Sequence, residues 1–301
     1  MEAPKCQGKL KSGKDCGYKA VLGNFCKIHG KNTVQEKPQA CITITYGDVC
    51  ENHAGMEKIG QEIMAGFDFS DLLQAKKKIE ELGGKAELIN LTELLDDPNP
   101  EDGIDENAEI FSAYILVVRG GANLLLKQIG KTADDMFQEH KNLTWDTKAK
   151  MKGKVVNKHA RHNLCYADVA HPADYENGKG TVVAFGDIPL TAHIRKVLPE
   201  LLGAKAEKLV AEGNLYYDVK KCGISWHGDF ERRVVVAFRF GASMPLRYQW
   251  YYRNKKVGKV FEIILNHGDM YVMDAKSVGT DWKKSSILTL RHAAGCQKYI
   301  Q

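Results

Sequence analysis

The sequence lacks any apolar run long enough to cross a bilayer. Its longest apolar runs, at residues 114–118 and 234–238, have the length of a β-strand, whereas a membrane-spanning helix needs about 20 such residues. The first six residues also lack the apolar core of a signal peptide. These absences predict an intracellular protein without a membrane anchor.

The body of the chain has no net charge. Residues 1–37 contain eight lysines and three acidic residues, so they carry the whole net charge of +5, and residues 38–301 balance to zero. A basic terminal module on a neutral body predicts that the module binds a polyanion such as nucleic acid. The alternative is a lysine-rich surface that serves solubility.

The eight cysteines do not indicate disulfide bonds, because an intracellular chain of this size is kept reduced. Cys6, Cys16, Cys26 and His29 offer four ligands with a closing Cys-x-x-His pair, which suits tetrahedral zinc. The segment between them has almost no apolar residues and would need a metal to fold. It resembles the small Cys3His zinc knuckles of viral and phage proteins. We therefore predict a zinc knuckle at residues 1–36; the alternative is a lysine-rich tail with incidental cysteines.

A small α/β region is predicted at residues 40–150, after a polar linker that contains Pro38. Strand-forming and helix-forming patterns alternate there. The strands are expected at residues 40–46, 85–91 and 113–118, the helices at 55–67 and 69–82, and an exposed acidic loop at 96–109. The stretch 119–123 lacks the spaced glycines and the lysine of a phosphate loop, so we expect a plain turn.

From residue 151 the chain becomes rich in strands. A helix is predicted at residues 189–202, starting with Pro189, and a shorter one at 204–211. Strands are predicted at residues 180–185, 214–217, 234–240, 247–252, 260–265, 270–273 and 285–291. This order predicts an α+β fold in which residues 151–301 form a double-stranded β-helix, or jelly roll, buttressed by helices.

One pair of residues in this half suggests a metal site. His227 and Asp229 are two residues apart at a strand end, so both side chains lie on the same face. An imidazole and a carboxylate in this arrangement suit two corners of an iron(II) site that leaves positions open. Arg291, at the end of the last predicted strand, would bind a dicarboxylate bidentately.

The surrounding residues resemble the AlkB-like 2-oxoglutarate/iron(II) dioxygenases over residues 157–295. Asn214-x-Tyr216 precedes His227-x-Asp229, as the Asn-x-Tyr strand precedes His-x-Asp in that family, and Leu288-Thr-Leu-Arg291 looks like its closing strand. The resemblance implies that His227 and Asp229 bind iron, and that Asn214, Tyr216 and Arg291 contact 2-oxoglutarate. Residues 40–295 also look like a family of oxygenases from phages and large DNA viruses.

The resemblance further implies a substrate and its recognition residues. Arg161, Tyr166 and Asp168 look like the family's nucleotide-recognition lid. The expected reaction uses molecular oxygen to hydroxylate or demethylate a modified nucleobase of DNA or RNA, which must be single-stranded or flipped out to reach a buried iron. Trp226 or Tyr166 would stack on that base; the alternative is that both are core aromatics.

The sequence departs from this family at the third metal ligand. Relatives carry a histidine between the strands that correspond to 270–273 and 285–291, and this chain has none there. The remaining choices are His292, Asp281, a water molecule or a residue of the N-terminal half. His292 neighbours Arg291, so on a regular strand it would face the opposite side, unless a bulge re-aims it. The family's second arginine is also missing, and Lys283 or Lys284 is its possible substitute.

Two other functions fit the same sequence. One is the same oxygenase chemistry on a protein or small molecule, with the zinc knuckle as a protein-docking module. The other is a non-catalytic nucleic-acid-binding protein whose metal centre is inactive. Oxygen consumption coupled to 2-oxoglutarate separates the second from the first, and salt-sensitive binding of single strands identifies a nucleic-acid substrate.

Overall fold

The computed structural model describes residues 4–10, 12–21, 24–26, 29, 39–96, 102–105 and 107–301. The chain divides into two compact units, Met1–Pro38 and Gln39–Gln301. Most of the predicted linker and part of the predicted acidic loop lie outside the described residues. None of the described helices has both the length and the apolar character required to cross a membrane.

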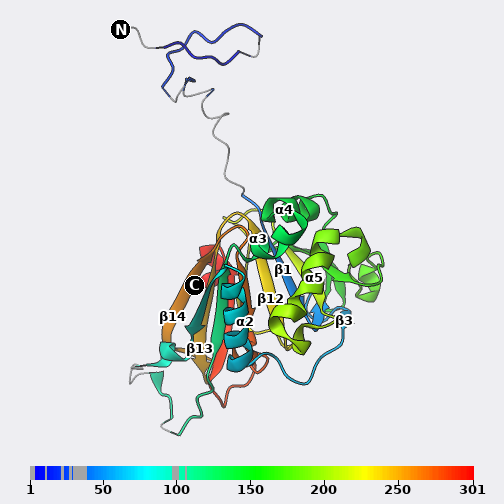
Figure 1. Cartoon of the computed structure of the whole chain (residues 1–301), viewed down its shortest axis with the longest axis vertical. Coiled ribbons are helices and arrows are strands. Elements are labelled where there is room, and N and C mark those ends of the chain that lie inside the picture. The colour runs from blue at the N-terminus through cyan, green and yellow to red at the C-terminus, as the bar shows by residue number, and fades with distance from the viewer. Residues whose placement is uncertain are drawn as a thin grey trace. The chain divides into compact units, whose positions relative to one another are not determined.

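The second unit contains two large, mostly antiparallel sheets (Figure 1). The eight-stranded sheet has the order β4 (Lys85–Asn90), β5 (Tyr114–Arg119), β15 (Met270–Met273), β12 (Val235–Gly241), β1 (Cys41–Gly47), β10 (Val210–Tyr216), β8 (His162–Ala167) and β9 (Val182–Ala184). The four-stranded sheet has the order β11 (Gly223–His227), β16 (Thr289–Gly295), β13 (Met244–Tyr252) and β14 (Lys255–Leu265). Two short ribbons pair β2 (Val49–Glu51) with β3 (Lys58–Gly60), and β6 (Lys148–Met151) with β7 (Lys154–Asn157).

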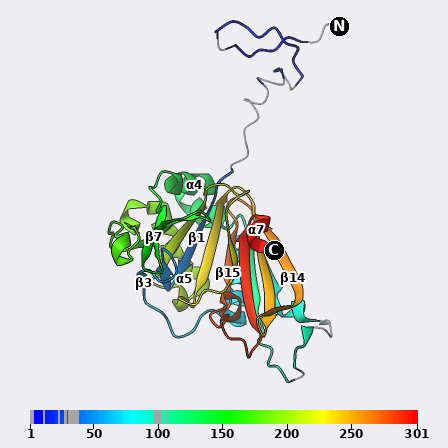
Figure 2. The same ribbon diagram turned by 180° about the vertical axis from the view of Figure 1, so that it is seen from behind.

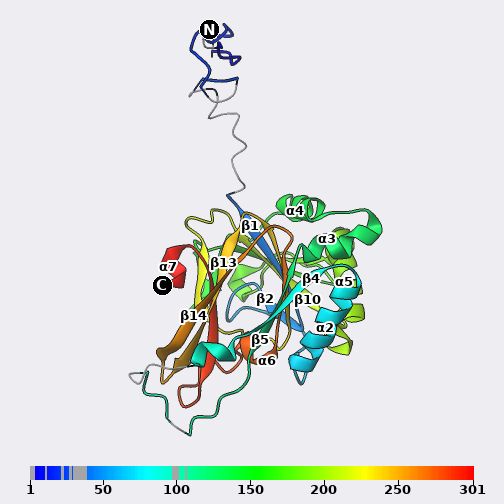
Figure 3. The same cartoon turned by 60° about the vertical axis from the view of Figure 1, so that its left-hand side comes forward.

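Helices cover one face of the eight-stranded sheet, and the four-stranded sheet lies on its other side (Figure 3). The covering helices are α2 (Phe69–Glu81), α3 (Gly121–Leu126), α4 (Ala133–Lys141) and α5 (Pro189–Leu202). The short helix α6 (Ala275–Val278) follows β15, and α7 (Gln297–Ile300) packs beside β11 and β16 of the four-stranded sheet (Figure 2). Single 3-10 turns lie at Thr92–Leu95, Lys127–Ile129, Tyr175–Asn177, Phe185–Asp187 and Ala204–Ala206.

Strand alternation creates two separate apolar cores. On β1, Ile42, Ile44 and Tyr46 face the helices and join the larger core. Cys41, one residue before Ile42, faces the four-stranded sheet and joins the second core. Because side chains alternate along a strand, the polar residues Thr43 and Thr45 of β1 also lie between the two sheets. That inner space holds the site described below.

The N-terminal strand β1 lies at the centre of the larger sheet. It pairs with β10 on one side and with β12 on the other, with Thr43 opposite both Asn214 and Arg239. Residues 40–150 are therefore not a separate region, and the predicted boundary at residue 150 is wrong, because β1, β4 and β5 share a sheet with the later strands.

Several predicted elements are confirmed and others are not. The mixed α+β class is confirmed, as are the helices at 69–81 and 189–202, and neither large sheet closes into a barrel within the described residues. The helix expected at 55–67 is wrong: Gly55 and Gly60 adopt positive φ there, and β3 occupies part of the segment. The helix expected at 204–211 ends after one turn, and the last strand runs over Thr289–Gly295 instead of 285–291.

Candidate metal centre

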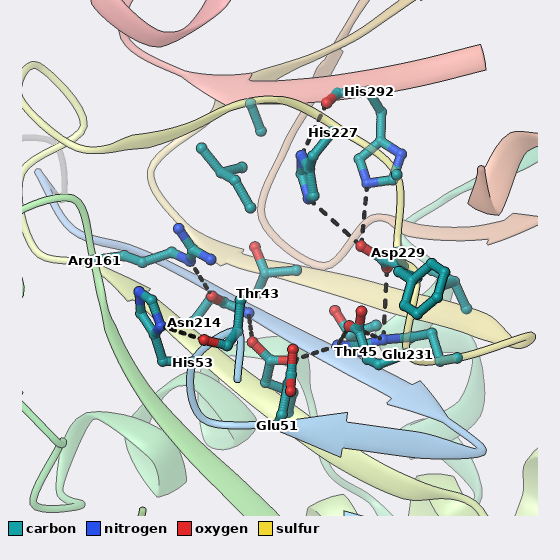
Figure 4. Close-up of a pocket in the computed structure, with 18 of the residues that line it drawn as sticks. Thr43, Thr45, Glu51, His53, Arg161, Asn214, His227, Asp229, Glu231 and His292 are labelled. Atoms are coloured by element: carbon teal, nitrogen blue, oxygen red, sulfur yellow. Dashed lines mark hydrogen bonds and ion pairs between the residues drawn. The ribbon is translucent and has the colours of Figure 1, made fainter. Parts of the chain in front are cut away.

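Three potential metal ligands converge between the two sheets. His227 ends β11, Asp229 lies in the loop that follows, and His292 lies on β16 directly opposite His227. Asp229 Oδ1 is 3.5 Å from His227 Nε2 and 3.6 Å from His292 Nε2. One ligand atom from each residue lies within 4.8 Å of the others, and Figure 4 shows the three side chains pointing toward one another.

These separations fit a shared metal ion better than hydrogen bonds. An N···O distance of 3.6 Å is too long for a hydrogen bond. Two ligands on one ion with bonds of about 2.1 Å lie roughly 3 to 3.4 Å apart. Two imidazoles and one carboxylate are also the donor set that leaves coordination positions open on a non-haem iron(II).

The protonation states in the cluster suit metal binding. His227 Nδ1 lies 2.7 Å from the Ser225 carbonyl and 3.1 Å from that of His292; since carbonyls only accept, Nδ1 must donate and Nε2 keeps its lone pair. Burial, together with His292, lowers the pKa of His227 to about 3. Burial opposes ionisation of Asp229, but Arg232 and His292 outweigh it and hold the pKa of that carboxyl below its usual value.

Strand parity places His292 inside because Arg291 faces outside. Every second residue of β16 faces the space between the sheets, namely Leu290, His292 and Ala294. Arg291 therefore lies on the outer face. The irregularity that brings the ligands together lies on the partner strand, between Ile224 and His227. The parity argument against His292 therefore fails because it assumed that Arg291 faced the metal.

Asp281 is not part of the cluster. Its Oδ2 accepts a hydrogen bond from Lys276 Nζ at 2.7 Å, and the residue does not line the cavity around the metal ligands. The rival assignment of Asp281 as third ligand is thus corrected in favour of His292.

The glycine between His227 and Asp229 allows the ligand loop to pack closely. A Cβ atom on Gly228 would lie 2.0 Å from the carbonyl oxygen of Gly279. The amide of Asp229 also donates a hydrogen bond of 2.9 Å to the Val278 carbonyl. The loop before β16 therefore fixes the direction of the Asp229 side chain.

Arg232 holds the carboxylates around the cluster. It is buried, with Nη2 2.5 Å from Glu212 Oε2 and 2.7 Å from Glu231 Oε1, and with Nε 3.6 Å from Asp229 Oδ2. This arginine orients Asp229 while leaving the other carboxylate oxygen, Oδ1, to face the two histidines. Sequence reasoning missed it, and the adjacent Glu231-Arg232 pair so near to Asp229 was the available signal.

A cavity of about 620 Å³ opens from the cluster. Asn214 and Tyr216 line it, as predicted for the Asn-x-Tyr strand, and so do Arg161 and Trp226. Asn214 Oδ1 accepts hydrogen bonds from Arg161 Nε at 2.6 Å and from Asn163 Nδ2 at 2.8 Å. Figure 4 shows Arg161 and Asn214 across the cavity from the histidines.

Two of the predicted substrate residues lie elsewhere. Tyr166 is fully buried on the helix-covered face, with its hydroxyl 3.1 Å from His140 Nδ1. Asp168 is exposed and forms an ion pair with Arg195. Neither lines the cavity, because residues 162–167 form the sheet strand β8 and not a lid.

Arg291 is also outside the cavity. Its guanidinium stacks 4.0 Å from the ring centre of Tyr251 and 5.3 Å from that of Trp282 on the outer face of the four-stranded sheet. The structure therefore does not bring Arg291 to the metal ligands, in contrast to the prediction. Lys284 does not line the cavity either, whereas Lys283 lies at its edge.

Arg239 on β12 is a buried arginine at the cavity. It lines the cavity, is only 1% exposed, and its Nε has no hydrogen-bond partner. Thr43, opposite it on β1, likewise has an unpartnered Oγ1. No carboxylate lies within 4.0 Å of Arg239 among the described residues. This residue was not identified from the sequence; its signal was a single arginine within the apolar run Val234–Phe240.

The other side of the cavity is acidic. Glu51, Glu212 and Glu231 line it together with His53. Burial and the charge of Glu231 raise the pKa of Glu51 to about 7. His53 lines the cavity, with its Nδ1 3.1 Å from the carbonyl of Ala54. This side of the cavity favours groups that donate hydrogen bonds or carry positive charge.

The first unit contains the predicted Cys3His cluster. His29 Nδ1 lies 3.3 Å from Cys6 Sγ and 3.6 Å from Cys26 Sγ, and Cys16 Sγ lies 3.8 Å from Cys26 Sγ. Tetrahedral zinc with bonds of about 2.3 Å to sulfur and 2.0 Å to nitrogen places its ligands roughly 3.5 to 3.8 Å apart. A Cβ on Gly8 would lie 2.3 Å from the His29 ring, so a glycine is needed there.

Comparison with known proteins gives one strong match. Over 260 residues the chain is 44% identical to an uncharacterized protein of Acanthamoeba polyphaga mimivirus, and the match covers 86% of this chain and 97% of that protein. No protein-family model matches the chain.

Proposed function

The chain belongs to the same family as this mimivirus protein, and we propose that it is an iron(II)/2-oxoglutarate-dependent dioxygenase acting on a modified nucleobase in DNA or RNA. The observation that carries the proposal is the convergence of His227, Asp229 and His292 on one side of a cavity. Two histidines and one carboxylate form a facial set that suits iron(II) and leaves room for other ligands.

Different residues of the cavity would hold the metal and 2-oxoglutarate. His227, Asp229 and His292 would hold the metal, and Arg232 orients Asp229. Arg239, with the Thr43 hydroxyl beside it, would bind the far carboxylate of 2-oxoglutarate through charge-assisted hydrogen bonds. When bound with molecular oxygen, iron(II) and 2-oxoglutarate would supply a reaction that places one oxygen atom in succinate, as 2-oxoglutarate loses carbon dioxide, and the other in a C–H bond of the substrate.

The proposed fold of the catalytic unit is a double-stranded β-helix in which β1 supplies one strand. From β10 to β16 the chain alternates between the two sheets, with β13 and β14 paired as a hairpin. This path, with β1 filling the gap between β10 and β12, supports the jelly-roll proposal.

The acidic side of the cavity supports a particular kind of substrate. A base alkylated on a ring nitrogen carries a positive charge, which Glu51 would stabilise together with the part of the charge of Glu212 and Glu231 that Arg232 leaves uncompensated. Arg161 and Trp226 at the same cavity offer a hydrogen-bond donor and a ring for such a base.

We further propose that Cys6, Cys16, Cys26 and His29 bind zinc and that this basic unit raises the affinity for nucleic acid. The ligand separations and the eight lysines of residues 1–37 support both parts.

The proposal is tested by measuring succinate release with methylated oligonucleotides and with bulk protein as substrates. We expect release with a methylated oligonucleotide, and its loss in His227→Ala. His171→Ala is the matched control, because this histidine pairs with Glu57 and does not line the cavity. Undiminished succinate release by His227→Ala would refute the assignment of His227 as a metal ligand. Succinate release with bulk protein alone would show that the substrate is a protein and not a nucleic acid.

A further inference from the structure

Aromatic and cationic side chains form a continuous row from the outer face of the four-stranded sheet to the loops beside the cavity. Lys256 Nζ lies 5.2 Å from the Trp226 ring, which lies 6.4 Å from the Tyr251 ring. Beyond Tyr251, the Arg291 guanidinium bridges to Trp282, and Lys283 lies between Trp282 and Phe230 at 5.6 and 4.7 Å. We call this set the stacking row; its members are Lys256, Trp226, Tyr251, Arg291, Trp282, Lys283 and Phe230.

The cations of the stacking row are available to an anion. Lys256, Lys283 and Arg291 have no carboxylate within 4.0 Å in the part of the chain that the structure describes. Other surface arginines do, as Arg247 does with Glu262 and Arg253 with Asp105. The row therefore presents positive charge that no protein carboxylate neutralises.

Three rings of the row are also accessible, whereas that of Tyr251 is buried. Phe230 is 56% exposed, and Trp226 and Trp282 are half-buried. Trp226 is held in place by a hydrogen bond of 2.8 Å from its Nε1 to the Gln301 carbonyl. A ring that is fixed and partly open is a ready platform for a stacked base.

The stacking row leads into the metal cavity. Four members of the stacking row also line the cavity, namely Trp226, Phe230, Trp282 and Lys283. Phe230 directly follows Asp229, and Trp226 directly precedes His227. A chain lying on the row would thus have one residue at the cavity entrance.

We propose that the stacking row binds single-stranded nucleic acid and presents one base to the cavity. This inference rests on the proposed function, since it names the surface that recognises its substrate. Bases stack on the aromatic rings and phosphates pair with the lysines and Arg291, the combination by which proteins hold single strands without reading their sequence. An acidic protein would satisfy the cations but would leave the exposed rings without a partner.

The test measures binding of a fluorescently labelled oligothymidylate to the full chain. We expect Phe230→Leu to weaken binding about fivefold or more through loss of one stacked base. Lys283→Ala should lower the salt slope by about 0.7. Lys259→Ala is the matched control, because this exposed lysine lies on β14 near Lys256 and contacts no ring.

A second readout reports on the row itself. Of the four tryptophans, Trp226 and Trp282 belong to the row, whereas Trp250 is fully buried and Trp145 packs against the larger core. Oligothymidylate should therefore quench part of the tryptophan emission, and Trp282→Leu should reduce the quenching. Wild-type affinity and quenching in the row variants would overturn the proposal. Equal competition by polyglutamate would also overturn it, since it would show binding of any polyanion without stacking.

The failure of this inference differs from a failure of the proposed function. Iron(II) and 2-oxoglutarate binding, measured by calorimetry in Lys256→Ala, should be unchanged, because Lys256 belongs to the stacking row and does not line the cavity. If the row binds oligothymidylate but wild-type protein binds no iron(II), the oxygenase proposal fails and the stacking row stands. If iron(II) and 2-oxoglutarate bind but the row variants lose nothing, the row proposal fails alone.

Discussion

Replacement of Arg239 by methionine should lower the affinity for 2-oxoglutarate without lowering the stability of the fold. Arg239 is buried between the sheets, its Nε has no partner, and its Nη1 reaches only Cys41 Sγ at 3.7 Å. Arginine stays charged in proteins, so the unliganded protein carries the cost of burying this charge. An apolar side chain of similar volume is neutral or stabilising at such positions, by up to about 4 kcal/mol.

The same change should remove most of the affinity for 2-oxoglutarate. Truncating one partner of a buried, hydrogen-bonded charge pair costs about 2–5 kcal/mol, which weakens binding by roughly 30-fold to several thousand-fold. We expect Arg239→Met to have an unchanged or higher free energy of unfolding. We also expect calorimetric titration of 2-oxoglutarate into the anaerobic iron(II) form to show this loss, with iron(II) affinity retained.

Arg291→Met is the matched control, because Arg291 stacks on Tyr251 outside the cavity. Its 2-oxoglutarate affinity should equal that of the wild type. The reasoning is refuted if Arg239→Met binds 2-oxoglutarate as tightly as the wild type, or if Arg291→Met loses the affinity instead.

Three further results are expected. His292→Ala should lose iron(II) as completely as His227→Ala in a metal-content assay, whereas Asp281→Asn should retain it; the reverse result would restore the one-histidine, two-carboxylate site. Removal of zinc by a chelator should flatten the salt dependence of oligonucleotide binding while sparing turnover of a short substrate, and an unchanged salt slope would assign the basic unit to another role. Burial lowers the pKa of His140 to about 3, so its contribution to stability is complete above the ordinary pKa of 6.5 and is lost as pH falls below it. Denaturation at pH 7.5 and pH 5 should show the wild type losing about 2 kcal/mol more than His140→Gln, and parallel losses would contradict this.

The pairing of His227 with Asp229 was predictable because their spacing is a local property. His227 and Asp229 are two residues apart at a strand end, and the structure brings both to the cavity. Asn214 and Tyr216 follow the same rule on β10 and also line it. Period-2 patterns therefore identified the two strands that form opposite sides of the site.

The third ligand and the arginine depended on pairing that the sequence does not show. The last strand begins at Thr289, four residues later than predicted, so His292 lies within it opposite His227. Arg239 faces the cavity because β12 pairs with β1. A contact between strands so far apart in the chain leaves no periodic signal, so the residue that completes the site could not be assigned from spacing alone.

The central position of β1 sets the order in which the protein is assembled during synthesis. β1 is translated before either of its neighbours, yet Cys41 pairs with Tyr216 and Gly241 after more than half of the chain has followed. Such distant pairing makes folding slow and leaves the early strand exposed to wrong partners. Because His292 lies on β16, the last strand to emerge, the three proposed iron ligands meet only when both sheets are complete. The proposed metal loading would therefore occur in the finished protein, since a nascent chain interrupted before β16 would present only His227 and Asp229.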